Sequence, residues 1–177
     1  MARTTLRAGT SAAAALAAAI ALALAAWSGS SWYAAAHDES AAFATARDKA
    51  LSAGEQAVQN LNTLDHRHLE SGLDAWEDST TGDLREELRE GRKAFEEEVR
   101  AARTVTTAKV LSGALSELDE RSGRASVLIA LRITVDAPDE KPSSKVSRLL
   151  GELTRTGGGW KLSGLAQAPT GETAAGN

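Results

Sequence analysis

The residue types that most often bind metals gather in one short segment of this chain. Asp65, His66, His68 and Glu70 lie within a stretch of six residues, and imidazole and carboxylate groups are common ligands of divalent metals. On a strand, His66 and His68 would share one face. The segment stands at the start of a predicted helix, however, where side chains two residues apart diverge. The sequence therefore predicts a solvated helix entrance here and no metal site.

Groups that could act in acid–base or nucleophilic catalysis are sparse elsewhere. The chain has no cysteine, which excludes disulfides and thiolate metal ligands. Its only tyrosine is Tyr33 and its remaining histidine is His37, and both precede the region predicted to form a sheet. Three glycines at 157–159 lie between two predicted strands, which is typical of a hairpin turn and not of a phosphate-binding loop. We expect no catalytic residue and no cofactor site.

The charge is unevenly distributed along the chain. Residues 1–36 contain Arg3 and Arg7 and no acidic residue, which leaves a formal net charge of −6 on residues 37–177 and −4 on the whole chain. An acidic domain repels the phosphate backbone of nucleic acids. We therefore expect no nucleic acid partner.

The N-terminal segment has the composition of a membrane anchor. No residue from 8 to 36 is charged, and the centre, from Ala12 to Trp27, consists almost entirely of alanine, leucine and isoleucine. A helix that spans a bilayer needs about 20 such residues. A helix buried in a soluble protein would carry a polar face, and this segment has none. The sequence predicts contact with the membrane through residues 8–33.

The flanking residues predict how this anchor is oriented. The two arginines before it place the N-terminus in the cytoplasm by the positive-inside rule, and the C-terminal domain on the outer side. Trp27, Trp32 and Tyr33 stand where interfacial aromatic residues lie on that outer side. The alternative is a cleaved signal peptide, for which the small residues at 34–36 would form the cleavage site. The bulky Trp32 and Tyr33 and the length of the apolar run favour an uncleaved, single-pass anchor.

The periodicity of apolar residues predicts three helices after the anchor. Apolar residues recur at steps of three and four over residues 37–62, 65–76 and 83–102. Thr80 and Asp83 have the spacing of a capping box before the third helix, and Thr81 is the alternative cap.

The period then changes to two, which indicates strands. The predicted strands are 104–118, 125–136, 143–156 and 160–166. The second of these is the clearest, with one wholly apolar face and one mixed face, and Gly113 and Gly164 are expected to bend the sheet. Helices followed by an antiparallel meander predict an α+β fold, with about three helices on one face of a curved sheet of about four strands.

Together these patterns divide the chain into three parts. Residues 1–36 form a cytoplasmic stub and anchor, with a hinge at 28–31 where serine and glycine disfavour a helix. Residues 37–168 form an extracytoplasmic α+β domain. Residues 169–177 are small and polar and are expected to be a disordered tail.

Three short segments stand out beside the single anchor and the alanine- and arginine-rich first helix. They are Leu64-Asp65-His66-Arg67-His68-Leu69, Ser79-Thr80-Thr81-Gly82-Asp83-Leu84 and Thr154-Arg155-Thr156-Gly157-Gly158-Gly159-Trp160-Lys161-Leu162. In this order they resemble the Mce-associated membrane proteins, which are bacterial accessory proteins often linked to Mce lipid-import machines. The resemblance implies a cone-shaped, nuclear transport factor 2-like domain, an accessory role without enzymatic activity, and a partner in a membrane-protein complex.

Two other functions stay open at this stage. The mixed face of the strand 125–136, with Leu128 and Ala130, could line a concave site for a small apolar ligand such as a lipid. The cone fold also hosts isomerases and dehydratases, which need a base in the pocket and an oxyanion donor. Asp136 stands at the very end of its strand, and Arg132 and Arg148 are expected on the solvated sheet face, so no residue here fits these roles well.

Overall fold

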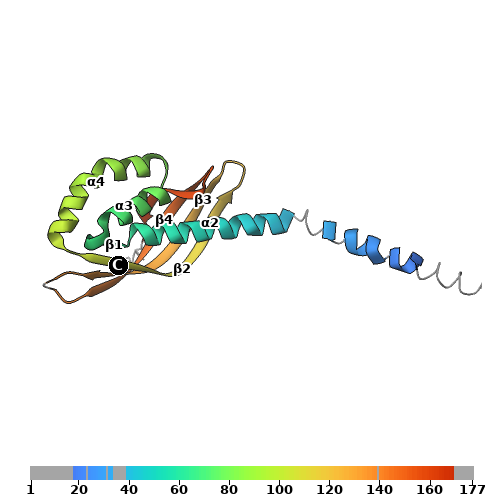
Figure 1. Ribbon diagram of the computed structural model, residues 1–177, viewed down its shortest axis with the longest axis horizontal. Helices are drawn as coiled ribbons and strands as arrows, with labels where there is room; N and C mark the ends of the chain where they lie inside the picture. Colours follow the sequence, from blue (N-terminus) through green and yellow to red (C-terminus); the bar gives the residue numbers. More distant parts are fainter. Residues whose placement is uncertain (1–17, 23, 31, 34–38, 139, 170–177) are drawn as a thin grey trace, which may run out of the picture. The chain divides into compact units, whose positions relative to one another are not determined.

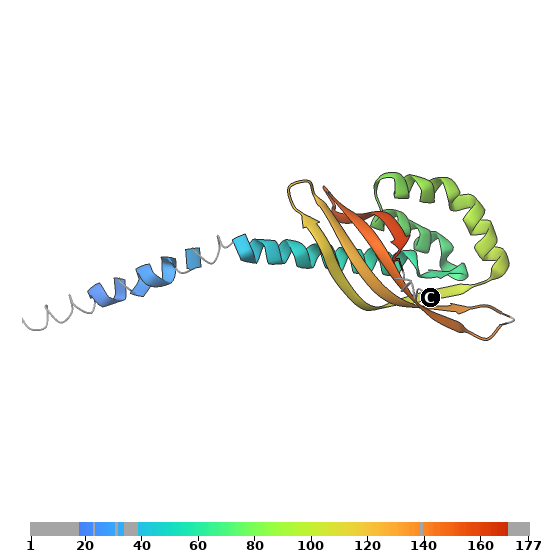
Figure 2. The same cartoon turned by 180° about the vertical axis from the view of Figure 1, so that it is seen from behind.

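The computed structural model describes residues 18–22, 24–30, 32–33, 39–138 and 140–169 (Figures 1 and 2). They belong to two compact units, which meet in sequence between Thr45 and Ala46. In the first unit, residues 18–22, 24–30 and 32–33 are helical. Within the described ranges, no helix is both long and apolar enough to cross a membrane. The rest of the predicted anchor, the proposed cleavage site at 34–36, His37 and nearly all of the predicted tail lie outside the described residues.

The second unit is built on an antiparallel meander with the strand order β1-β2-β3-β4-β5. The strands are β1 (Leu64–Asp65), β2 (Val105–Asp119), β3 (Arg124–Asp136), β4 (Ser143–Thr156) and β5 (Gly159–Gln167). The expectation of about four strands was wrong, because β1 was missed. It consists of two residues that pair with Thr106 and Val105, and two residues are too few to show a period of two.

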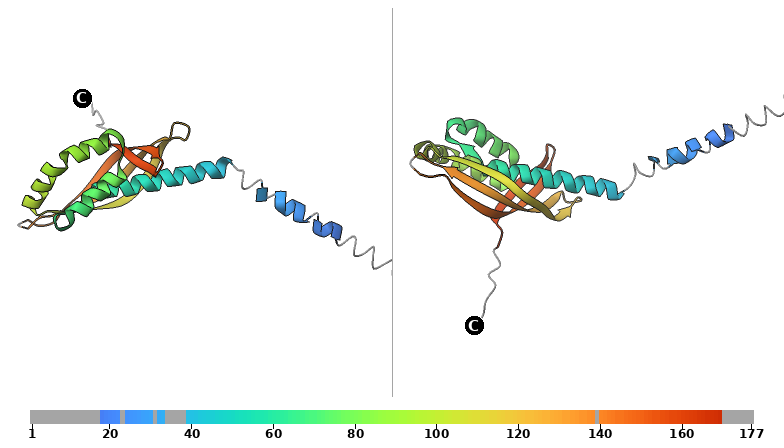
Figure 3. Two further views of the ribbon diagram at one scale, coloured as in Figure 1. Left: turned by 45° about the horizontal axis from the view of Figure 1, so that its top comes forward. Right: turned by 90° about the horizontal axis from the view of Figure 1, so that it is seen from below.

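The helix α2 (Glu39–Leu61) begins in the first unit and continues into the second. In the second unit its residues Ala50, Ala57 and Val58 are buried in the core. A Cβ atom at Gly54 would stand only 2.9 Å from Val127 Cγ2, so the helix backbone lies very close to β3. Small residues therefore let this part of α2 pack directly on the sheet, which curls around it (Figure 3).

The side chains of β3 alternate between the core and the opposite face of the sheet. Val127, Ile129 and Leu131 are fully buried, whereas Leu128 between them is 41% exposed. Burying each such side chain stabilises the fold by roughly 1.5–3 kcal/mol. The mixed face therefore points away from α2, and the apolar face that a ligand would need is filled by the protein's own side chains. In the described part of the domain, the face toward α2 is occupied by the core, and Leu128 and Ala130, which were expected to line a lipid site, lie on the opposite face.

The bends of the sheet lie beside the predicted glycines. The pairing of β2 with β3 shifts between Val110 and Ser112 and again between Leu115 and Glu117, on either side of Gly113. The pairing of β4 with β5 shifts next to Gly164. Each shift adds one residue to one strand, which is a β-bulge that bends and twists it.

The helix predicted at 65–76 is present from residue 69 onward, and two short elements precede it. They are β1 and the 3-10 turn η1 (His66–His68), and the helix itself is α3 (Leu69–Ser79). The backbone of Asp65 is extended, and its carboxylate accepts a hydrogen bond from the Arg67 amide. The His66 amide also donates to the Thr104 carbonyl, so the chain here is held to β2 before α3 begins.

The last helix, α4 (Gly82–Ala102), begins within one residue of its predicted start, but the predicted capping box is not formed. Thr80 is fully buried, and its hydroxyl donates to the Trp76 and Glu77 carbonyls at the end of α3. Thr81 takes the N-cap position of α4 without a side-chain hydrogen bond, and its amide donates to the Leu162 carbonyl of β5. Both threonines therefore fix the junction between α3, α4 and the sheet.

Candidate functional site

A groove of about 500 Å³ lies between α3, α4 and β5. Its apolar walls come from one face of each helix and from one residue of β5. These residues are Leu73 and Trp76 of α3, Leu84, Leu88 and Phe95 of α4, and Leu165 of β5. The rings of Trp76 and Phe95 meet with their centroids 5.3 Å apart, a distance typical of aromatic packing.

The groove separates two hydrophobic clusters that do not merge. The larger cluster joins α2 to the sheet, with Leu84 and Leu165 packed at its border. The smaller cluster has Leu69 and Leu73 at its centre, with Phe95 packed against it. Helix α4 contributes no fully buried residue to either cluster. Its apolar stripe is half-exposed, and the space beneath it is the groove.

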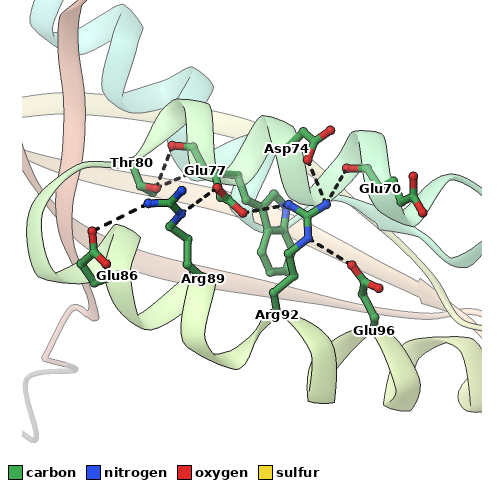
Figure 4. A network of polar contacts seen from close by, with 9 residues as sticks. Glu70, Asp74, Glu77, Thr80, Glu86, Arg89, Arg92 and Glu96 are labelled. Carbon is green, nitrogen blue, oxygen red and sulfur yellow. Dashed lines mark hydrogen bonds and ion pairs between the residues drawn. The ribbon is translucent and has the colours of Figure 1, made fainter.

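Ion pairs join α4 to α3 next to the contact between Trp76 and Phe95 (Figure 4). The Arg92 guanidinium lies 2.8 Å from Glu77 Oε1, 2.9 Å from Asp74 Oδ1 and 3.1 Å from Glu96 Oε1. Arg89 adds a second contact to Glu77 at 3.3 Å. Hydrogen bonds to Glu77, and then to Asp74 and Glu96, raise the pKa of Arg92 above its ordinary value. Such multidentate contacts of arginine are geometrically specific, so they fix the spacing of the two helices.

The lining of the groove is better suited to binding an apolar group than to catalysis. Glu77 and Arg92 are already paired with each other, and the other charged residue of the lining is Glu87 on the exposed side of α4. The described lining holds neither a histidine nor a hydroxyl, so it offers no pairing of a nucleophile with a base. Preformed walls and a few polar groups at the rim are common in sites that bind apolar ligands or chain segments.

The predicted metal-ligand cluster is organised around Asp65. His66 Nδ1 and His68 Nδ1 each lie 3.6 Å from a different oxygen of its carboxylate. Arg67 occupies both oxygens through shorter hydrogen bonds, the closest 2.7 Å, and lowers the pKa of Asp65 below its ordinary range. Among the described residues, no group of three or more histidine, cysteine or carboxylate side chains could hold a metal ion.

A second pocket, polar and of about 490 Å³, lies at the end of the β2–β3 hairpin. Four carboxylate residues line it together with Arg124; they are Asp83, Glu117, Asp119 and Glu152. Hydrogen bonds from Ser122, and then from the Arg121 amide, lower the pKa of Asp119. This carboxylate therefore stabilises the turn of the β2–β3 hairpin.

The remaining sequence-predicted residues lie away from the groove. Arg132 and Arg148 are exposed on the outer sheet face, as expected, and Asp136 is exposed at the end of β3. Sequence reasoning found the apolar stripes of the two helices but missed the groove that they form. The spacing of Arg92 and Glu96 is that of an ion pair within one helix, whereas the contacts of Arg92 to α3 join residues 15 or more positions apart.

Comparison with known proteins adds a family match over most of the chain. The model of the family described as "Uncharacterized protein Rv1363c/MT1408-like" matches residues 11–169. The protein Rv1363c of Mycobacterium tuberculosis is 28% identical over 124 residues, which cover 70% of this chain and 47% of that protein. The chain thus spans about half the length of this relative.

Several solved structures share the fold at low sequence identity. An IcmL-like type IV secretion system protein of Legionella pneumophila aligns with a TM-score of 0.57 at 11% identity, covering 70% of this chain and 93% of that one. The periplasmic domain of DotI gives 0.55 at 16% (68% and 93% covered), and VirB8 of Agrobacterium tumefaciens gives 0.52 at 8% (67% and 90% covered). These similarities confirm an α+β fold with helices packed on an antiparallel sheet, which this chain shares with these proteins.

Proposed function

Because this chain belongs to the Rv1363c/MT1408-like family, we propose that it is a membrane-anchored accessory protein without enzymatic activity. Its α+β domain would act outside the cytoplasm, within a complex of envelope proteins, and the groove between α3 and α4 would be its docking site. The single observation that carries this proposal is the groove itself, which is preformed, apolar and without a catalytic pair. A shared fold alone does not determine function.

Two further observations support the proposal. Proteins of similar fold include a type IV secretion system protein and the periplasmic domain of DotI. In the first unit, the large side chains at 20, 22, 24, 27, 32 and 33 are all more than half exposed, and exposed apolar clusters mark membrane or protein contacts. We propose that residues 8–33 supply the anchor, with the N-terminus in the cytoplasm. A link to an Mce-type lipid-import complex is a narrower proposal, which rests on the resemblance of the three short segments described above.

The topology is tested by protease treatment of intact spheroplasts that carry the full chain. We expect digestion of residues 37–168 from outside, with the undigested full-length chain in the membrane fraction beforehand. A shortened chain in the medium would identify a signal peptide instead. A domain that is protected until the cells are lysed would place it in the cytoplasm.

The groove is tested by photo-crosslinking from a single amino acid in cells. A photoreactive residue at Leu88, inside the groove, should form an adduct with a membrane protein, and one at Lys93, on the exposed side of α4, should not. Equal adducts from both positions, or adducts from neither, would contradict docking in the groove.

A small apolar ligand is the second candidate for the same groove. Its volume of about 500 Å³ lies within the roughly 300–1,000 Å³ that is usual for small-molecule sites. Native mass spectrometry of the full chain, released from detergent, would show a bound lipid as an added mass. The variant Leu88→Trp, which fills the groove, should lose that mass if the lipid occupies this site.

A further inference from the structure

The outer face of the sheet, on the side opposite α2, has an apolar centre. The strand pairing places one small or apolar residue of each long strand side by side in a single row. This row, called the central row here, consists of Ala114 of β2, Leu128 of β3, Leu150 of β4 and Ala166 of β5. Leu128 is 41% exposed, and Ala114 and Ala166 are exposed as well. Contiguous apolar surface on an open sheet is a feature of contacts with partners, so this row is the natural centre of such a contact.

Opposite charges flank the central row on its two sides. The neighbouring row toward the β2–β3 hairpin carries Glu117 and Glu152, which lie on either side of Ser126. The neighbouring row on the other side carries Arg148, and the row beyond it carries Lys109 and Arg132. All five side chains are exposed, and none of them forms an ion pair with another described residue. The two rows next to the apolar centre are therefore acidic on one side and basic on the other, whereas the second row on the acidic side is mixed and carries Asp119, Arg124 and Lys161.

We propose that this outer face is an interface between two copies of the chain. Two faces that pack against each other by two-fold symmetry need an axis that lies in the interface. An axis parallel to the strands would place each charged row opposite the same row of the second copy, so that like charges would face each other. An axis across the strands, along the central row, places Glu152 of each copy opposite Arg148 of the other. Electrostatic complementarity therefore selects the second arrangement.

The same arrangement predicts which residues meet. Residues of the central row lie on the axis, so Leu128 faces Leu128 and Leu150 faces Leu150 of the second copy. Further out, Asp119 would oppose Lys109, whereas Arg124 would oppose Arg132, so the outer rows contribute little net attraction. Because the attraction comes from a few side chains on a small patch, the dimer should be weak and should weaken further in high salt.

Cysteine cross-linking tests this arrangement, because the chain has no cysteine of its own. The full-length variant Leu128→Cys, in membranes and under mild oxidation, should form disulfide-linked dimers. The control Thr107→Cys lies exposed on the same face, three rows from the axis, and would be roughly 40 Å from its own copy at about 3.4 Å per residue. We expect at least about fivefold more dimer from Leu128→Cys, because a disulfide needs Cβ atoms within about 4.5 Å. Equal yields from the two variants would overturn the proposal.

Charge reversal tests the pairing itself in the Leu128→Cys background. Arg148→Glu or Glu152→Arg alone places like charges opposite each other twice in the symmetric dimer. Each should lower the yield of dimer about tenfold, since two attractive contacts become repulsive in every dimer. The double variant Arg148→Glu/Glu152→Arg, and an equal mixture of the two single variants, should both restore it. Failure of both restorations would show that these two residues do not meet.

Discussion

Helices α2 and α4 are of similar length, 23 and 21 residues, yet they are attached to the protein in different ways. The alanines and Gly54 of α2 bring its backbone onto the sheet, where Ala50, Ala57 and Val58 are buried. Helix α4 has no fully buried residue and contacts α3 through the ion pairs of Arg89 and Arg92 and through the packing of Phe95. Close packing leaves no space for a ligand, whereas attachment by ion pairs at the rim leaves an open groove behind the helix. The candidate site therefore lies where the core is least complete.

The largest effect should come from the core that α2 shares with the sheet. Ile129→Ala removes a fully buried side chain and should lower the free energy of unfolding by about 2–5 kcal/mol, because the cavity left behind cannot collapse completely. The matched control is its neighbour Leu128→Ala on the outer face, which should cost less than about 1 kcal/mol. Urea denaturation followed by circular dichroism measures both. Similar losses from the two variants would contradict the assignment of the two faces.

The attachment of α4 is tested by removal of Arg92. Arg92→Ala leaves Glu77 and Glu96, whose side chains are only 19% and 23% exposed, without their main partner, and should cost about 1–3 kcal/mol. Hydrogen exchange should become faster in α4 and stay unchanged in residues 46–61 of α2. The control Arg100→Ala, whose ion pair is long and whose side chain is 58% exposed, should cost less than about 0.5 kcal/mol. Equal acceleration of exchange in both helices would show that they unfold as one unit.

The same substitution should act in opposite directions in the two helices. Gly54→Ala places a Cβ atom 2.9 Å from Val127 and 3.2 Å from Leu153, and should destabilise the protein by about 1–2 kcal/mol because the helix is forced off the sheet. A Cβ atom at Gly91 of α4 meets no atom within 4 Å. Gly91→Ala should therefore stabilise by about 0.5–1 kcal/mol, through helix propensity. Thermal melts measure the change in melting temperature of each variant. A higher melting temperature for Gly54→Ala would disprove the close contact of α2 with β3.

The smallest effect concerns Asp65, at the point where the chain leaves β1. Its pKa is lowered in the folded protein by Arg67, so its ionised form stabilises the fold above its ordinary pKa of 3.8 and this contribution is lost as the pH falls below that value. Asp65→Asn should lower the melting temperature slightly at pH 7 and make its decline below pH 4 shallower. Melts between pH 7 and pH 2 test this. If the melting temperature declined equally below pH 4 in both proteins, the Arg67 contact would contribute no stability.

The sequence predicted the elements that repeat a pattern over many residues. The alternation of 125–136 could be recognised because every second residue faces α2, and α4 could be recognised from its apolar stripe. The two-residue strand β1 carries too little pattern to be seen. Thr80 was assigned to the wrong helix, because its hydroxyl could cap α4 or close α3, and only the position of β5 decides between them.

The candidate groove could not be predicted from local pattern in the same way. It depends on the distance between α3 and α4, and Arg92 sets that distance through contacts with Asp74 and Glu77 on another element. The sequence gives the types of these residues and their spacing within each helix. The local sequence pattern does not show which face of α3 packs against which face of α4. That pairing depends on the length and path of the chain through the junction at Thr80 and Thr81.

The bulges of β2 interrupt an edge of the sheet that could otherwise pair with other chains. Beyond Val105 and Thr106, which pair with β1, no described strand covers the outer edge of β2. A long, regular edge of this kind is a template on which other chains can add strands and grow into aggregates. The extra residues Leu111 and Ser116 interrupt its row of hydrogen-bonding groups twice within six residues. An incoming strand can therefore match only a short stretch of this edge before it loses register, which disfavours the growth of strand-paired aggregates.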